Sequence, residues 1–204
     1  MITIESAQGK LAADPNGPTV IRQDPNDPTS LLAGISTDYF NAANIDASGI
    51  DFESSYKFDL GASNLKLSLG WSRYLKYEVP INGETIDAVG SFNFGNFVRS
   101  MPQDKASLAA HWQLDQHSVY ARMDYVSSYL NNRQGETIDS FAPVEMQYRY
   151  LFDMQDAEAA ISVGVINLFD EAPPLVNDGA NFSYDPKQHD PRGRIFYVKG
   201  SYSF

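Results

Sequence analysis

The chain of 204 residues is long enough for one domain with a sizeable core, and its hydrophobic content of 43% excludes a disordered chain. The formal net charge of -11 argues against a nucleic-acid partner, because that partner requires a basic surface. The absence of cysteine excludes disulfides and thiolate chemistry. No run of about 18 apolar residues exists, so we expect no transmembrane helix.

The first 32 residues are predicted to form a loop-rich segment. Two near-copies that are dense in turn formers lie within it, Asp14-Pro-Asn-Gly-Pro and Asp24-Pro-Asn-Asp-Pro. Neither has the alternating oxygen ligands and distal Glu of a calcium loop, so we interpret both as solvated turns. The opening Met1-Ile-Thr-Ile-Glu lacks the basic region and apolar core of a signal peptide. Either the protein is not exported or the chain lacks its true beginning.

Alternation of apolar and polar residues predicts about seven clear strands and one weak strand, with no convincing helix between them. Successive side chains of a strand point to opposite sides, so each strand has one apolar and one polar face. The strands are expected at residues 34–41 (the weak one), 48–59, 65–77, 106–114, 119–129, 144–152, 161–170 and 194–204. The strand at 65–77, about a dozen residues, is longer than the usual five or six and is near the nine to eleven that cross a bilayer at a tilt.

The predicted connections alternate between short and long ones. The short connections cover residues 60–64, 115–116 and 153–158, and the long ones cover 78–103, 131–139 and 170–193. Strands joined by tight turns must be antiparallel, so tight turns gather at one end of the sheet and long loops at the other. This sorting is typical of an outer-membrane barrel, as are aromatic residues near the strand ends.

No catalytic, metal or cofactor site is predicted, and we expect no enzyme. His111, His117 and His189 lack the spacing of a metal site, and no glycine-rich phosphate loop is present. Ser107 and His111 share a strand face, but positions four apart along a strand are separated by about 13 Å, too far for direct proton transfer. We interpret the remaining charged residues of this region as lumen charges that pair across strands, namely Arg122, Asp124, Glu145 and Arg149.

Several short motifs follow one another at the carboxy-terminal end. In chain order they are Asn167-Leu168-Phe169-Asp170, Pro173-Pro174, Tyr184-Asp185-Pro186, Asp190-Pro191-Arg192-Gly193-Arg194 and a final strand that ends in Phe204. Upstream, Asn44 with Ser48-Gly49-Ile50-Asp51-Phe52 forms a strand opening. Each motif alone is weak evidence for a family, but the combination and order of the motifs resemble the carboxy-terminal end of TonB-dependent outer-membrane receptors. The resemblance extends from about residue 20 to the end.

The resemblance implies an antiparallel, up-and-down, 22-stranded transmembrane β-barrel closed around an amino-terminal plug. Receptors of this family import scarce nutrients, such as siderophore-bound iron, vitamin B12 or carbohydrates, with energy passed on by TonB. Seven or eight strands make up about a third of such a wall. We therefore expect residues 33–204 to form the last third of a receptor barrel and residues 1–32 to form an extracellular loop. The plug that contacts TonB is not expected in this chain, and the ligand is not predicted.

The resemblance also implies a location and partners. The wall would contact outer-membrane lipid of a Gram-negative bacterium. Its final strand resembles the signal that the barrel-assembly machinery recognises, with Tyr202 and Phe204 as the recognition residues. A segment of a wall leaves backbone groups unpaired at its edges, and each unpaired group in lipid costs several kcal/mol. We therefore expect no transport by the isolated chain.

Two other hypotheses stay open. A free-standing eight-stranded barrel with a structural or adhesive role requires residues 34–41 to pair with the last strand at 195–204. A soluble sandwich that acts as a binding module requires the apolar faces of the strands to pack against one another in a dry interior. The surroundings of residues 65–71, 106–114 and 196–204 distinguish the sandwich from either barrel.

Overall fold

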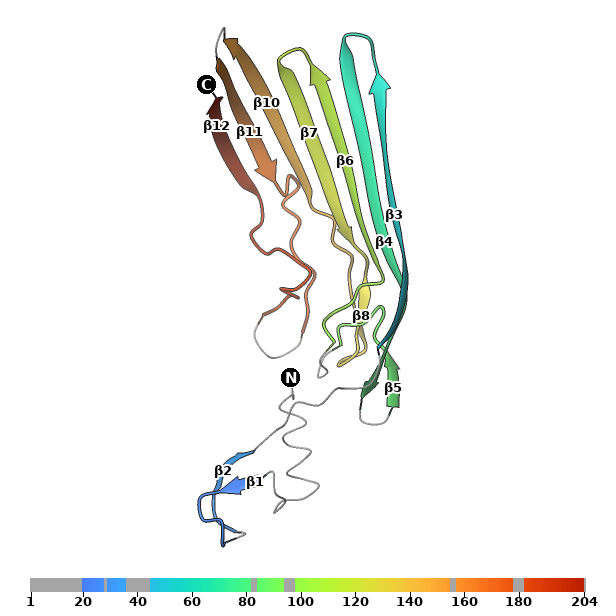
Figure 1. Ribbon diagram of the computed structural model, residues 1–204, viewed down its shortest axis with the longest axis vertical. Coiled ribbons are helices and arrows are strands. Elements are labelled where there is room, and N and C mark those ends of the chain that lie inside the picture. The colour runs from blue at the N-terminus through green and yellow to red at the C-terminus, as the bar shows by residue number, and fades with distance from the viewer. Residues whose placement is uncertain are drawn as a thin grey trace.

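The computed structural model describes residues 20–27, 29–35, 45–81, 84–93, 98–154, 157–177 and 182–203. Every regular element in these ranges is a β-strand, and all paired strands are antiparallel (Figure 1), which confirms the predicted all-β class. None of the described residues belongs to a helix that is long and apolar enough to cross a membrane.

One large sheet and two small ones contain these strands. The large sheet consists of β3 (Asp46–Asp59), β4 (Ser63–Ile81), β5 (Glu84–Asp87), β6 (Asp104–Leu114), β7 (His117–Val126), β10 (Val144–Met154), β11 (Ala157–Ile166) and β12 (Ile195–Ser203). The small sheets pair β1 (Val20–Arg22) with β2 (Leu32–Ile35) and β8 (Tyr129–Asn131) with β9 (Glu136–Ile138).

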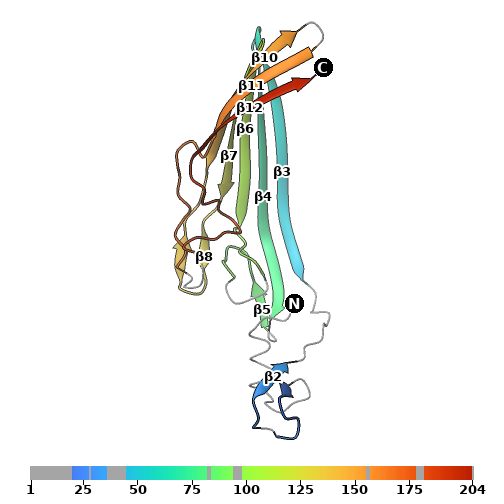
Figure 2. The same cartoon turned by 90° about the vertical axis from the view of Figure 1, so that its left-hand side faces the viewer.

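The large sheet is a single layer of long strands that alternate in direction. Its order is β12-β11-β10-β7-β6-β4-β3, and the short β5 pairs with the far end of β4. Figures 1 and 2 show the tight hairpins at one end of this layer and the long loops at the other. Two residues with positive φ, Gly61 at 79° and Asp115 at 48°, make the first two tight turns, and the Asp59 carboxylate accepts the Gly61 N–H at 3.0 Å. The predicted sorting of the connections is therefore confirmed.

The three tight hairpins are staggered along the strands. One row of paired residues crosses all three, through Asp59, Asn64, Gln113, Ser118, Arg149 and Ser162. Four residues of the chain separate Asp59 from Asn64, and twelve separate Arg149 from Ser162, so the third hairpin extends four residues further than the first. Strands rise about 3.3 Å per residue and lie about 4.8 Å apart. The tip of the third hairpin lies four residues further along the strands than the tip of the first, and four strand spacings separate the two tips across the sheet. The line through the hairpin tips is therefore inclined by about 35° to the row of paired residues.

Several predicted loops contain short strands. The first 32 residues were expected to be loop, but Val20–Arg22 pairs with Leu32–Ile35; residues 1–19 lie outside the described part. The predicted loop at 131–139 contains β9, which pairs with β8 at its start. The predicted loop at 78–103 contains β5, because β4 continues to Ile81 and forms a hairpin with it. These strands have three or four residues, too few for a pattern of alternation to show.

Two predicted strands are too long. The strand expected at 119–129 ends at Val126, and Tyr129 begins the separate strand β8. The strand expected at 161–170 ends at Ile166, because Asn167 and Asp170 both have positive φ, 52° and 57°. Residues with positive φ cannot continue a strand, and Asn and Asp tolerate this conformation better than most residues. The Asn-Leu-Phe-Asp motif is therefore a tight turn in which the Asp170 N–H donates to the Asn167 carbonyl at 3.0 Å.

Both edges of the large sheet are open in the described part of the chain. There, β3 pairs only with β4, and β12 pairs only with β11. An eight-stranded barrel would need residues 34–41 to pair with β12. Instead, Gly34 and Ile35 pair with β1, and residues 36–41 lie outside the described part. The pairing that this hypothesis requires is thus not found among the described residues.

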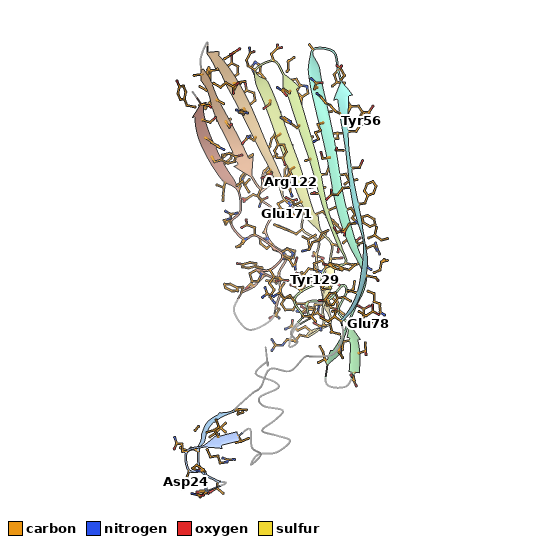
Figure 3. The ribbon with its side chains drawn as sticks, viewed as in Figure 1. Asp24, Tyr56, Glu78, Arg122, Tyr129 and Glu171 are labelled. Carbon is orange, nitrogen blue, oxygen red and sulfur yellow. The ribbon has the colours of Figure 1, made fainter. Side chains whose placement is uncertain are left out.

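The buried hydrophobic clusters lie beside the loops and not under the sheet. One cluster contains Phe92, Tyr129, Ile138 and Val176. The other contains Val79, Ala88 and Val98, covered by residues such as Tyr77 and Met101. Side chains gather in this region below the strands in Figure 3, where Tyr129 is labelled. The long connections therefore pack on one another and form a layer at one end of the sheet.

Candidate functional site

The large sheet has one continuous apolar face. The strand register places apolar side chains side by side, as in the row Tyr56, Leu67, Ala110, Ala121, Met146, Val165 and Phe196. Many of these side chains are open to the surroundings of the chain: Leu69 is 40%, Leu108 45% and Phe196 75% exposed. The three apolar stretches at 65–71, 106–114 and 196–203 therefore share one open face. The sandwich hypothesis requires them to fold against one another, and they do not.

Charged groups and tight turns bound this apolar face along the strands. At the loop end, Arg73 and Asp104 form an ion pair at 3.2 Å, and the Trp71 indole N–H donates to the same carboxylate at 3.0 Å. At the hairpin end, β6 finishes at Leu114, directly before Asp115. The ten residue steps from Asp104 to Leu114 span about 33 Å along the strand, which corresponds to a height of about 27 Å at an inclination of about 35°.

Aromatic side chains are concentrated at the hairpin end of this face. Tyr56 and Phe58 pack edge-to-face with ring centroids 4.6 Å apart, as do Tyr150 and Phe152 at 4.8 Å. A hydrogen bond of 2.7 Å joins His117 Nδ1 to the Tyr148 hydroxyl. Tyr and His combine a large apolar body with a polar tip, a combination suited to a boundary between apolar and aqueous surroundings.

The opposite face of the sheet is polar and contains a groove of about 890 Å³. Its lining comes from β3, β4, β6, β7 and β10 and includes Glu53, Lys66, Ser107, His111, Tyr120, Arg122, Gln147 and Arg149. Ser107 and His111 both line it, but nothing in the described part brings them into hydrogen bonding. The prediction that Arg122 pairs across strands is wrong. Its guanidinium bonds to Asp124 of the same strand at 2.7 Å, because residues two apart share a face.

The loop layer contains a buried polar centre. Asp185 is 0% exposed, and one of its carboxylate oxygens accepts the Tyr129 hydroxyl at 2.8 Å. Burial, with the neighbouring carboxylate, raises the pKa of Tyr129, so its hydroxyl stays protonated as the donor. His189, 4% exposed, lies beside the rings of Tyr129 and Phe141, at centroid distances of 6.1 and 5.3 Å. Burial lowers the pKa of His189, although Asp185 opposes this effect.

Hydrogen bonds connect the three long loops to one another. The Gln188 amide donates to the Ser100 carbonyl at 2.8 Å, which joins the third loop to the first. The Tyr129–Asp185 bond joins the second loop to the third. Glu171 accepts the Ala142 N–H at 3.2 Å and gives a second connection between the same two loops. The loop layer is therefore one connected unit.

Two of the carboxy-terminal motifs contact each other. Asp170 of the Asn-Leu-Phe-Asp turn accepts the Arg194 backbone N–H at 2.9 Å, and the Arg194 guanidinium donates to the Leu168 carbonyl at 3.3 Å. Within the turn, Asn167 and Glu171 exchange two hydrogen bonds of 2.9 Å between the side-chain amide of Asn167 and the Glu171 backbone. Gly193 has φ 67°, and the Asp170 carboxylate lies close to the space that a side chain there would occupy. The motifs thus fix the start and the end of the third loop.

One of the two predicted recognition residues, Tyr202, lies near the end of β12. Tyr202 pairs with Ala159 in the register, is on the apolar face and is 64% exposed. Phe204 lies outside the described residues. On the other face of β12, the Tyr197 ring covers Gly164 of the neighbouring strand, and its hydroxyl donates to Gln147 at 3.0 Å.

Sequence patterns did not identify the polar centre of the loop layer or the Tyr197–Gly164 contact. Tyr184-Asp185-Pro186 was noted only as part of a motif, and Tyr129 was assigned to a strand. A buried bond between residues 56 positions apart leaves no periodic signal in one sequence. The three histidines lie in three places: His111 on the polar face, His117 at the hairpin end and His189 in the loop layer. Among the described residues, no group of three metal-ligating side chains is found.

Comparisons with known proteins complete these observations. No model of a known protein family matches the sequence. A search of curated proteins also gave no match.

Proposed function

We propose that the chain forms the carboxy-terminal part of the wall of a TonB-dependent outer-membrane receptor, a transmembrane barrel of 22 strands. In this role, the apolar face contacts lipid and the polar face lines the lumen. The receptor would import a scarce nutrient, such as a siderophore-iron complex, vitamin B12 or a carbohydrate. The observation that carries the proposal is the continuous apolar face of a single-layer sheet, open across its strands.

The energetics of this face favour an apolar environment. Burial of a Val, Leu, Ile or Phe side chain is worth about 1.5–3 kcal/mol, so a whole exposed face is a large cost in water. A soluble protein recovers this energy with a second layer, but the described residues supply none over the sheet. Hydrocarbon would recover it without a second layer.

The dimensions of the sheet also support a membrane wall. The height of about 27 Å between the Arg73–Asp104 pair and the hairpins is close to the apolar band of about 25 Å on outer-membrane barrels. The inclination of about 35° lies at the lower end of the 35–45° tilt that barrel closure requires. Trp71, with its N–H on Asp104, has the position expected of an interfacial anchor.

The open edges of the sheet favour the interpretation that the chain is part of a larger barrel wall over the interpretation that it forms a complete small barrel. In lipid, unpaired edge groups cost several kcal/mol each, so β3 and β12 need further strands beside them. The resemblance of the carboxy-terminal motifs gives those strands an identity, namely the rest of a receptor barrel. On this proposal TonB acts through a plug. The barrel-assembly machinery would recognise Tyr202 and Phe204 on the terminal strand.

Reconstitution of the full chain into lipid vesicles tests the proposal. We expect the chain to stay with the vesicles after a urea or carbonate wash, and to give no ligand-specific flux. A folded chain that remains in the aqueous phase without detergent would contradict the membrane wall. Ligand-specific flux through vesicles that contain this chain alone would contradict its role as a segment of a larger barrel.

A further inference from the structure

The last strand of the large sheet has fewer constraints on its register than the strands beside it. Within the described part of the chain β12 pairs only with β11, whereas β11 and β10 each have a strand on both sides. A short connection joins β10 to β11 and limits the register of that pair, but residues 167–194 separate β11 from β12. The register of β12 therefore depends on contacts along the strand and at its start.

The apolar pattern of β12 excludes only some of the alternative registers. A slip of one residue would turn Phe196, Val198 and Tyr202 to the polar face. A slip of two residues would keep all three on the apolar face and would retain most of the nine backbone pairs between β11 and β12. Phe196 is 75% exposed, so no facing layer interlocks with this side of the strand. The apolar face therefore discriminates weakly between these registers.

The polar face supplies a contact that only one register permits. Tyr197, Gly164 and Gln147 lie in one row across β12, β11 and β10. The Tyr197 ring covers Gly164, the only glycine of β11, and occupies the space that a Cβ there would fill. Its hydroxyl reaches past β11 and donates to the Gln147 side-chain oxygen at 3.0 Å. One side chain of β12 therefore contacts both of the next two strands.

A slip of two residues in either direction would destroy this contact. Tyr197 would then pair with Ser162 or Ile166 in place of Gly164, and both of these residues have side chains on the polar face. The ring would lose the space over Gly164, and the hydroxyl would leave the row of Gln147. Aromatic rings packed over glycines are one means by which the register of a sheet is pinned.

A second contact acts directly before β12. The Asp170 carboxylate accepts the Arg194 backbone N–H at 2.9 Å, which connects the start of the strand to the turn that follows β11. This contact lies outside the paired residues and involves an Arg194 side chain that is 43% exposed. The Tyr197 contact lies within the pairing, so substitutions can separate the effects of the two.

We propose that Tyr197 is a positioning residue that sets the register of β12 by seating its ring over Gly164. The register of an edge strand determines the height at which a further strand pairs with it. Tyr197 therefore also sets the stagger with which β12 joins the rest of a barrel wall. The stagger rests on the proposed function, and the register does not. Cross-links between β11 and β12 measure the register without reference to lipid, so failure of this inference and failure of the proposed function are distinguishable.

Disulfide trapping in the full chain, folded in a non-ionic detergent, tests the inference, because the chain has no cysteine of its own. Ser162→Cys with Lys199→Cys reports the observed register, since these two residues are paired. Ser162→Cys with Ser201→Cys and Ala160→Cys with Lys199→Cys report slips of two residues in the two directions. In the observed register the Cα atoms of either slipped pair are about 8 Å apart, beyond the reach of a disulfide.

We expect the paired cysteines to cross-link about tenfold or more faster than either slipped pair. Tyr197→Ala should reduce this preference about fivefold or more, because the ring contact and the hydroxyl bond are both lost. Tyr197→Phe keeps the ring and should reduce the preference less. Tyr202→Ala is the matched control, because it removes an aromatic side chain from the opposite face of the same strand. It should change the preference by less than about twofold.

An unchanged preference in Tyr197→Ala would assign the register to the Asp170–Arg194 contact and would overturn the inference. An equal loss from Tyr202→Ala would reduce the effect to a general loss of aromatic surface and would overturn it as well. If Tyr197→Ala does not fold and forms none of the three cross-links, Gly164→Ala gives the decision, because a Cβ at this position displaces the ring. A reduced preference in Gly164→Ala would support the inference, and an unchanged one would overturn it.

Discussion

The sheet and the loop layer are stabilised in opposite ways. In the loop layer, Val79, Ile138, Val176 and Asp185 are almost fully buried, and hydrogen bonds join three long connections. The large sheet has long ladders of backbone hydrogen bonds, but its apolar side chains remain open on one face. The loop layer therefore carries its own buried clusters, and the large sheet between this layer and the hairpins does not.

This difference shows where each region obtains its free energy. The loop layer buries apolar groups within the chain, so its stability depends on internal contacts. The sheet can recover the energy of its apolar face only from something outside the chain, such as lipid. Substitutions in the loop layer should therefore act through internal contacts, and substitutions on the apolar face of the sheet should act through contact with lipid. The following predictions test this difference from the largest expected effect to the smallest.

Leu108→Arg should have the largest effect. Leu108 lies near the middle of the apolar face, where an arginine in lipid costs about 2–4 kcal/mol. The measurement is the folded fraction in lipid vesicles during a urea titration. Ala109→Arg is the control, because the next residue points into the polar groove. Equal destabilisation by both substitutions would remove the distinction between the two faces.

Tyr129→Phe should destabilise the loop layer by about 1.5–3 kcal/mol, because it leaves an oxygen of the buried Asp185 carboxylate without its donor. Hydrogen exchange should accelerate at 129–138 and 182–189 while the strands of the sheet stay protected. Tyr125→Phe, on the apolar face of the sheet, should leave both regions unchanged. Accelerated exchange throughout the sheet would mean that the two regions are not stabilised separately.

Gly164→Ala should destabilise the pairing of β11 with the edge strand β12 by about 1–3 kcal/mol. A Cβ at this position overlaps the Tyr197 ring, so the ring must move and its hydroxyl bond to Gln147 is lost. The measurement is the urea midpoint of the folded chain in detergent. Gly200→Ala on the neighbouring strand meets no atom within 4 Å and should have little effect. A larger loss from Gly200→Ala would contradict this packing.

The smallest effect should be a pH dependence of the loop layer. Burial lowers the pKa of His189, opposed by Asp185 and supported by Lys105, so the unfolded state binds a proton at a higher pH than the folded state. The stabilisation is complete above about pH 6.5 and is lost as the pH falls below that value. The protection factor at 182–189, which is the intrinsic exchange rate at each pH divided by the observed rate, should therefore fall at mildly acidic pH, and His189→Phe should remove this dependence. A protection factor that rises on acidification would reverse the sign and contradict the account.

The sequence predicted the sheet much better than the loop layer. Alternation gave every long strand within a few residues, because each has one apolar and one polar face, as β6 illustrates with Leu108 beside Ser107. The loop layer has no such period. Its polar centre joins Tyr129 to Asp185 across 56 residues, which only the folded chain reveals. The turn at Asn167 was assigned to a strand because the apolar residues before it suggested continuation.

The central claim is that the apolar face contacts hydrocarbon. The chain has two tryptophans, Trp71 and Trp112, and replacement of both by Phe gives a background for single probes. Leu108→Trp and Ser107→Trp then place a tryptophan on opposite faces of β6 at nearly the same height. In vesicles of brominated lipid, the account predicts strong quenching of the probe at 108 and weak quenching of the probe at 107, with the opposite order for aqueous acrylamide. Equal quenching of both probes by the lipid, or protection of the probe at 108 from both quenchers, would contradict it.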